Sequence, residues 1–152
     1  MSDTTTQFQR GSFLLPAFGH ATVADAMHPG ILSCDPDASL TKVARVMSIH
    51  HVHCVAVMAL VHDESGQSLV WGMISDLDLL EAGVEDGVEP TARMLAKQPI
   101  VTVRPGTSLR EAGQAMVDNA VTHLVVVDPE TQRPIGIVST LDLAGVLAWG
   151  EA

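Results

Sequence analysis

The sequence predicts a mixed α/β (α+β) fold in which two tandem β-α-β-β-α repeats pack as one pseudo-two-fold module. Two observations support this prediction. Apolar residues make up 47% of the 152-residue chain and charged residues only 17%, which is the composition of a globular protein with a sizeable core. Residues 22–84 can also be aligned with residues 91–149, with matching motifs in the same order.

The first anchor of this repeat is a proline-containing segment followed by an amphipathic helix. Cys34–Leu40 aligns with Val103–Leu109. In both copies apolar residues then recur at positions i, i+3, i+4 and i+7, which is the spacing of one buried helix face. Ser39 and Ser108 come directly before these stripes, so we expect them to cap the two helices.

The second anchor lies at the end of each copy, where Gly72–Leu79 aligns with Gly136–Leu143. The alignment offset changes between the two anchors because the turn before the last strand is longer in the first copy (62–68) than in the second (129–133). Matching anchors on both sides of a turn of variable length indicate a duplicated unit.

The domain organisation follows from this duplication. We expect an N-terminal arm over residues 1–21, the first repeat over 22–84, a linker over 85–90 and the second repeat over 91–149. One copy of about 60 residues buries too little surface to be stable alone, so the two copies are expected to pack against each other.

The repeated motif Gly-apolar-apolar-Ser-x-x-Asp is the candidate functional site. It lies where a strand ends and a helix begins, and unpaired N–H groups there attract phosphate. Its glycine allows close approach to the backbone. Ser75 and Ser139 begin the helices, and Asp78 and Asp142 could accept both hydroxyls of a ribose. The alternative is a capping box, in which the acid binds the N–H of the serine. Duplication of the whole motif favours the ligand interpretation.

Five segments form an ordered set of motifs: Val23–Met27, Gly72–Asp78, Thr102–Pro105, His123–Asp128 and Gly136–Asp142. Their order resembles the CBS domain family. The resemblance covers residues 22–148 and implies a pair of CBS domains, a Bateman module, with two clefts that bind AMP, ADP, ATP or sometimes S-adenosylmethionine.

The resemblance also implies a role for individual residues. The aspartates would hold the ribose hydroxyls, the serines would approach the phosphate or ribose, and the first strand of each copy would contact the adenine. In the second copy the expected nucleotide-binding residues are Ile100, Val101, Thr102, His123, Gly136, Ser139, Thr140 and Asp142. In the first copy they are Ile31, Ser33, Gly72, Ser75 and Asp78.

The charge balance restricts the partners. Eight Lys and Arg against eighteen Asp and Glu leave a net charge of −10, which repels nucleic acid and anionic lipid. No apolar run approaches the length of a membrane span. Cys34 and Cys54 have no motif spacing and suit a reducing compartment, so we expect a cytoplasmic protein. We also expect a homodimer, by family resemblance, and an unidentified regulated protein as partner.

The chain has no Walker loop, no Gly-x-Ser-x-Gly motif and no paired acids with a suitable base, so we expect no enzyme, no catalytic residues and no cofactor beyond the nucleotide. Two alternatives remain open. The chain could be a structural or interaction subunit with empty clefts. It could also be a metal-responsive protein that uses His50, His51 and His53, although no fourth ligand is evident and no metal site is assigned.

Overall fold

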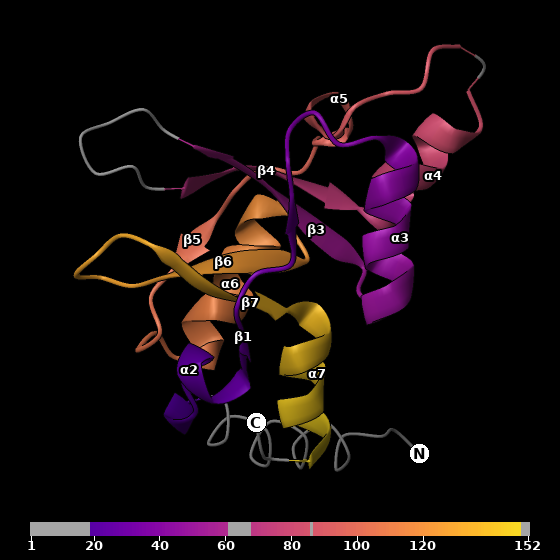
Figure 1. Cartoon of the computed structure of the whole chain (residues 1–152). Helices are drawn as coiled ribbons and strands as arrows, with labels where there is room; N and C mark the ends of the chain where they lie inside the picture. The colour runs from indigo at the N-terminus through magenta and orange to yellow at the C-terminus, as the bar shows by residue number, and fades with distance from the viewer. Residues whose placement is uncertain (1–18, 61–67, 86, 150–152) are drawn as a thin grey trace, which may run out of the picture. The chain divides into compact units, whose positions relative to one another are not determined.

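The computed structural model describes residues 19–60, 68–85 and 87–149 (Figure 1). The predicted N-terminal arm therefore lies almost entirely outside the described residues, as does most of the longer turn of the first copy. The chain forms two compact units. Among the described residues, unit 1 comprises 19–29, 101–129 and 136–149, and unit 2 comprises 30–60, 68–85, 87–100 and 130–135.

Unit 2 is built on a three-stranded sheet of order β2-β3-β4. The short strand β2 is parallel to β3, and β3 is antiparallel to β4 with a bulge after Val57. Helices α3 and α4 pack together beside these strands (Figure 1). The elements are β2 (Ser33–Cys34), α3 (Leu40–His50), β3 (Cys54–Leu60), β4 (Ser68–Ser75), α4 (Asp76–Gly83) and α5 (Ala92–Leu95).

Unit 1 is built on a four-stranded sheet of order β1-β7-β6-β5. Strand β1 is antiparallel to β7, and β5 is parallel to β6. The elements are α2 (Val23–Ala26), β1 (His28–Pro29), β5 (Thr102–Val103), α6 (Leu109–Asn119), β6 (His123–Val127), β7 (Pro134–Ser139) and α7 (Thr140–Trp149). The mixed α+β class predicted from the sequence is confirmed. In the part of the chain that the structure describes, no helix has the length and apolar character needed to span a bilayer.

The amphipathic helices α3 and α6 have the same construction. The hydroxyl oxygen of Ser39 accepts the Lys42 N–H at 3.2 Å, and that of Ser108 accepts the Glu111 N–H at 3.2 Å. Both predicted caps are therefore present. Each helix ends at a residue in the left-handed conformation with φ of 53°, which is His51 in one copy and an alanine in the other.

The predicted apolar stripes are buried. Val43 and Met47 of α3 lie in the core of unit 2, against Val55 and Val57 of β3. On α6 the buried side chains are Leu109, Ala112 and Met116. The apolar stripes of both helices therefore serve core packing, which is the usual origin of this periodicity.

The segment that leads each repeat packs on the other repeat. In unit 1, the N–H of Val23 donates to the carbonyl of Thr107 at 2.8 Å, and β1 pairs with β7. In unit 2, the N–H of Ala92 donates to the carbonyl of Ala38 at 2.8 Å. The compact units therefore cut across the sequence repeats, because each short leading helix completes the core of the unit in which it lies.

Gly136 permits the close approach of β1 to β7. A Cβ atom at this position would lie 2.6 Å from the carbonyl oxygen of His28, a backbone atom. We expect Gly136→Ala to lower the free energy of unfolding by about 1–3 kcal/mol, because the strand pair must separate to make room. Urea unfolding followed by circular dichroism measures the change.

Gly145 is the matched control for this substitution. It lies inside α7 with nothing within 4 Å of its ideal Cβ position. Gly145→Ala should leave the stability unchanged or raise it by up to about 1 kcal/mol, as alanine favours helix. Equal effects of the two substitutions would contradict the steric argument.

Candidate functional site

Each repeated Ser-x-x-Asp motif forms a reciprocal capping box at a strand–helix junction. At the start of α4 the Ser75 N–H donates to Asp78 Oδ2 at 2.9 Å, and the Asp78 N–H donates to Ser75 Oγ at 3.1 Å. At the start of α7 the Ser139 N–H donates to Asp142 Oδ2 at 2.7 Å, and the Asp142 N–H donates to Ser139 Oγ at 3.2 Å. The capping alternative is thus realised in both copies, and it holds each carboxylate in a defined position.

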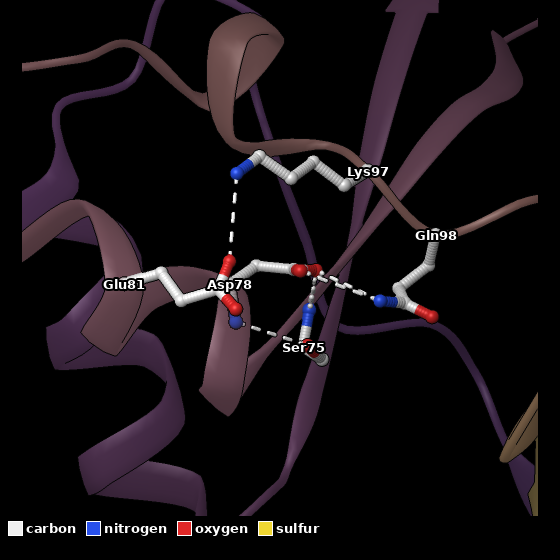
Figure 2. A network of polar contacts seen from close by, with 5 residues as sticks. All are labelled: Ser75, Asp78, Glu81, Lys97 and Gln98. Atoms are coloured by element: carbon white, nitrogen blue, oxygen red, sulfur yellow. Dashed lines mark hydrogen bonds and ion pairs between the residues drawn. The ribbon is translucent and has the colours of Figure 1, made fainter.

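The carboxylate of unit 2 is the more enclosed. Asp78 is 5% exposed and is a buried charged residue, which requires hydrogen-bond donors. Figure 2 shows the Gln98 amide directed at it from the segment after α5, with Nε2 at 3.3 Å from both carboxylate oxygens. The neighbouring Lys97 instead reaches Glu81 at 3.5 Å on the surface. The described contacts therefore engage both oxygens of Asp78.

The carboxylate of unit 1 is held differently. Oδ2 of Asp142 accepts both the N–H and the hydroxyl of Ser139, at 2.7 and 3.0 Å. Oδ1 lies 2.8 Å from Nε2 of His28 on β1. The His28 side chain is 79% exposed and that of Asp142 is 11% exposed. The partner of Oδ1 is thus a surface side chain that can leave without disturbing the core.

His28 and Gln98 occupy equivalent places, and neither is among the site residues predicted from the sequence. His28 pairs with Ile137 and Gln98 bridges to Met73, and these two partners hold the same position of the repeated motif. A signal was present, since a polar residue followed by proline comes shortly before β2 and β5 (His28-Pro29 and Gln98-Pro99). Nothing in the sequence indicated that these side chains reach the carboxylate of the other repeat.

The motif glycines contact the chain itself. A Cβ at Gly136 would meet the backbone of His28, and a Cβ at Gly72 would lie 2.8 Å from the Cβ of Ala96. Both glycines therefore allow the leading segment to pack closely. Their predicted role in admitting a ligand to the backbone remains a prediction.

The other predicted residues of unit 1 gather along one edge of its sheet. Because β5 is parallel to β6 and β7 lies beside β6, the starts of β5 and β6 and the end of β7 share that edge. Thr102, His123 and Ser139 lie there. The Val101 carbonyl is engaged by the Val125 N–H at 3.0 Å. The N–H of the exposed Thr140 donates to Thr122.

The predicted nucleotide-binding residues of unit 2 lie near the start of β2 and the end of β4. Ser33 pairs with Ala56, and Cys54 at the start of β3 pairs with Ser75. Ile31 is partly exposed and precedes β2, so it lies toward the same end of the sheet. Ile100 is the last residue of unit 2 before the chain enters unit 1, and it is also partly exposed.

Neither cysteine has the properties of a nucleophile. Burial raises the pKa of the Cys54 thiol to about 12, with a further contribution from the nearby carboxylates of Asp78 and Asp76. Burial also raises the pKa of Cys34. Both thiols are therefore protonated at neutral pH, whereas the thiolate is the reactive form.

The histidine cluster forms a separate surface feature. His53 Nδ1 lies 3.0 Å from Asp76 Oδ2, and this hydrogen bond holds the pKa of Asp76 below its usual range. A hollow of about 440 Å³ between α3 and α4 includes both residues and His51, but none of the predicted nucleotide-binding residues. Among the described residues, no three His, Cys, Asp or Glu side chains gather to hold a metal ion, so the cluster with His50 is not assembled.

The family assignment follows from a comparison of the whole sequence. The model of the CBS domain matches residues 23–85 and 92–148. This chain belongs to the CBS domain family. The resemblance inferred from the motifs is confirmed, and both copies of the repeat are CBS domains.

Known CBS proteins are similar over most of this CBS domain pair. A CBS domain-containing protein, YhcV of Bacillus subtilis, is 27% identical over 127 residues, which are 82% of this chain and 84% of YhcV. A similar solved structure is the CBS domain pair of protein MJ0100 in complex with 5′-methylthioadenosine and S-adenosyl-L-methionine. Its TM-score is 0.70 at 18% sequence identity, and the match covers 84% of this chain and 96% of the MJ0100 chain.

A third similar structure is the CBS domain of a bacterial CNNM/CorC family Mg²⁺ transporter in complex with ATP. Its TM-score is 0.74 at 19% identity, with 96% of this chain and 99% of that chain covered. At these identities the two structures support the fold of the CBS pair.

The contact between His53 and Asp76 predicts a pH-dependent contribution to stability. Folding lowers the pKa of the Asp76 carboxyl from its unfolded value near 3.8. Such a group stabilises the folded protein at pH values above its unfolded pKa, and this stabilisation is lost as the pH falls through its pKa in the folded protein. Because both side chains are more than half exposed, we expect Asp76→Asn to lower the free energy of unfolding at pH 7 by less than about 1 kcal/mol.

The effect of Asp76→Asn should shrink further at pH 3, and urea unfolding at both pH values measures it. His53→Ala serves as the partner variant and should follow the same profile. If Asp76→Asn lowers the free energy of unfolding as much at pH 3 as at pH 7, the contact with His53 is not the cause of the loss.

Proposed function

We propose that this CBS domain pair is a non-catalytic regulatory module that binds an adenine nucleotide, AMP, ADP or ATP, through its Ser-x-x-Asp motifs. One observation carries the proposal. Asp142 is fixed by Ser139 through Oδ2 alone, while Oδ1 is directed to the exposed side chain of His28. A positioned carboxylate with one oxygen held by an exposed side chain that can move away is suited to recognition of ribose hydroxyls.

The surroundings of Asp142 suit the rest of a nucleotide. The start of α7 offers the positive end of a ten-residue helix, which favours a phosphate despite the net charge of the chain. Thr102 and His123 share the sheet edge with Ser139, so polar groups of three strands lie at the same end. We assign the adenine to the side of β5, as the family resemblance implies.

The ligands of similar structures support this class of compound. The CBS pairs solved with 5′-methylthioadenosine and S-adenosyl-L-methionine, and with ATP, share the adenosine group. The adenosine group is also the part that a carboxylate and an apolar strand can recognise. We therefore expect adenine compounds to bind and guanine compounds to bind less tightly.

We assign the stronger site to unit 1. In unit 2 the Asp78 carboxylate is 5% exposed and Gln98 contacts both of its oxygens. A ribose would have to displace a buried contact there, whereas in unit 1 it displaces an exposed one. Substitution of Asp142 is therefore expected to affect binding more than substitution of Asp78.

Regulation requires a partner that responds to the ligand. The ligand can control that partner only if it binds one conformational state more tightly than another. Exposed apolar residues at equivalent places of α4 and α7, Leu77 at 62% and Leu141 at 71%, are suited to protein contacts. We assign them to the homodimer interface or to the regulated protein. The cytoplasmic location remains a prediction from the sequence.

Thermal unfolding with AMP, ADP, ATP, GTP and S-adenosylmethionine tests the proposal. A ligand at about 100 times its Kd adds roughly 2.7 kcal/mol to the free energy of unfolding, which raises the Tm by about 2–8 °C. We expect this shift with one or more adenine nucleotides, and a smaller one with GTP. Asp142→Asn should remove most of it, because asparagine retains an acceptor for the Ser139 N–H but loses the charged oxygen.

Two variants serve as comparisons. Asp118→Asn changes an exposed carboxylate of unit 1 that accepts a hydrogen bond from Gln114, and it should leave the ligand shift intact. Asp78→Asn should reduce the shift less than Asp142→Asn. If no nucleotide moves the transition at millimolar concentration, the chain is a structural or interaction subunit with empty sites.

A further inference from the structure

The carboxylate of Asp142 does not have enough free acceptor positions for both its present partner and a ribose. A carboxylate offers about four lone-pair positions, two on each oxygen. The N–H and hydroxyl of Ser139 use two on Oδ2, and His28 uses one on Oδ1. Two ribose hydroxyls need two positions, and one remains. His28 must therefore leave before the ribose can bind through both hydroxyls.

The backbone holds His28 in this competing position. Its Cα pairs with that of Ile137 in the β1–β7 ladder, and its carbonyl oxygen lies over Gly136. Two residues later Gly30 has a positive φ of 80°, and unit 2 begins there. The side chain is 79% exposed, so rotation away from Asp142 costs little packing. The contact is thus poised to open without unfolding β1.

Among the described residues, few are charged on the elements near the His28 ring. On α7 the only charged residue is Asp142, on β7 there is none, and β6 carries His123 as its titratable residue. On α2, Asp25 is engaged by the N–H and hydroxyl of Thr22 at 2.9 and 3.0 Å. Asp142 is therefore the charged group in contact with His28, at 2.8 Å.

We propose that His28 is an internal competitor of the ribose at Asp142, so that ligand binding in unit 1 weakens as the pH falls. This inference rests on the proposed function. Histidine is the side chain that gains a charge between pH 8 and 5. A protonated imidazole holds a carboxylate by a charge-assisted hydrogen bond, which is stronger than the neutral one. Protonation therefore closes the contact and reduces the fraction of protein that can bind.

Unit 2 has an equivalent contact to its motif carboxylate, but the contacting side chain does not change charge with pH. Gln98 occupies the equivalent place and contacts Asp78, but an amide does not change its charge with pH. The two sites of the pair are therefore expected to respond differently to acid. Exchange of the two residues between the units provides a matched test.

Isothermal titration with 5′-methylthioadenosine and with AMP, at pH 5.5 and pH 8, tests this inference. The first probe has no phosphate, so its charge is constant over this range. We expect the Kd of the wild-type protein to be about two- to fivefold higher at pH 5.5, the size that an exposed ion pair allows. His28→Gln retains a donor and should bind 5′-methylthioadenosine with the same Kd at both pH values.

His28→Ala removes the competitor and should bind about two- to fivefold more tightly than the wild type at pH 5.5. Gln98→His should add a pH dependence at Asp78. A change in Kd relative to the wild type is assigned to the unit that carries the substitution. Circular dichroism checks that the variants are folded.

The possible results distinguish failure of the competition by His28 from failure of nucleotide binding itself. Equal Kd values at both pH values in the wild type, or weaker binding by His28→Ala, overturn the competition and leave the proposed function intact. A Kd for 5′-methylthioadenosine that is lower at pH 5.5 than at pH 8 also overturns it, because competition by His28 predicts the opposite direction. If neither probe, nor ADP or ATP, binds the wild-type protein or any of these variants at millimolar concentration, the proposed function fails.

Discussion

The junction between the last strand and the closing helix of each repeat is the structural element on which the site depends. There the serine N–H and the aspartate carboxylate bind each other, at 2.9 Å in unit 2 and 2.7 Å in unit 1. This contact satisfies N–H groups that every helix start leaves unpaired. It also fixes a carboxylate at the edge of the sheet, so the same interaction serves the fold and positions the group that we propose as the ribose acceptor.

The leading segments make the surroundings of the two motif carboxylates different. Each segment packs on the motif of the other repeat, over Gly136 in unit 1 and Gly72 in unit 2. The residue that it brings to the carboxylate is His28 in one case and Gln98 in the other. One duplicated architecture therefore presents a titratable, exposed partner at one site and a neutral partner at a buried carboxylate at the other.

Much of this architecture could be predicted from local patterns. The apolar stripes around Val43 and Met116, the caps at Ser39 and Ser108, and the motif at Gly136 are all visible in short windows of sequence. Such patterns are dictated by helix and strand geometry within a few residues. Their duplication predicted the mixed fold, and the resemblance of the motifs to a known family predicted CBS domains; both are confirmed.

The partners of the carboxylates depend on contacts between residues far apart in the chain. Asp142 and His28 are separated by 114 positions, and no local pattern relates them. The capping box could be weighed from sequence, but only packing decided that Oδ1 of Asp142 faces an exposed ring and that Asp78 is buried under Gln98. The sequence by itself determined the elements, their order and the residues of the motif. The tertiary structure alone decided the exposure and occupancy of each carboxylate, because these depend on which distant segment covers it.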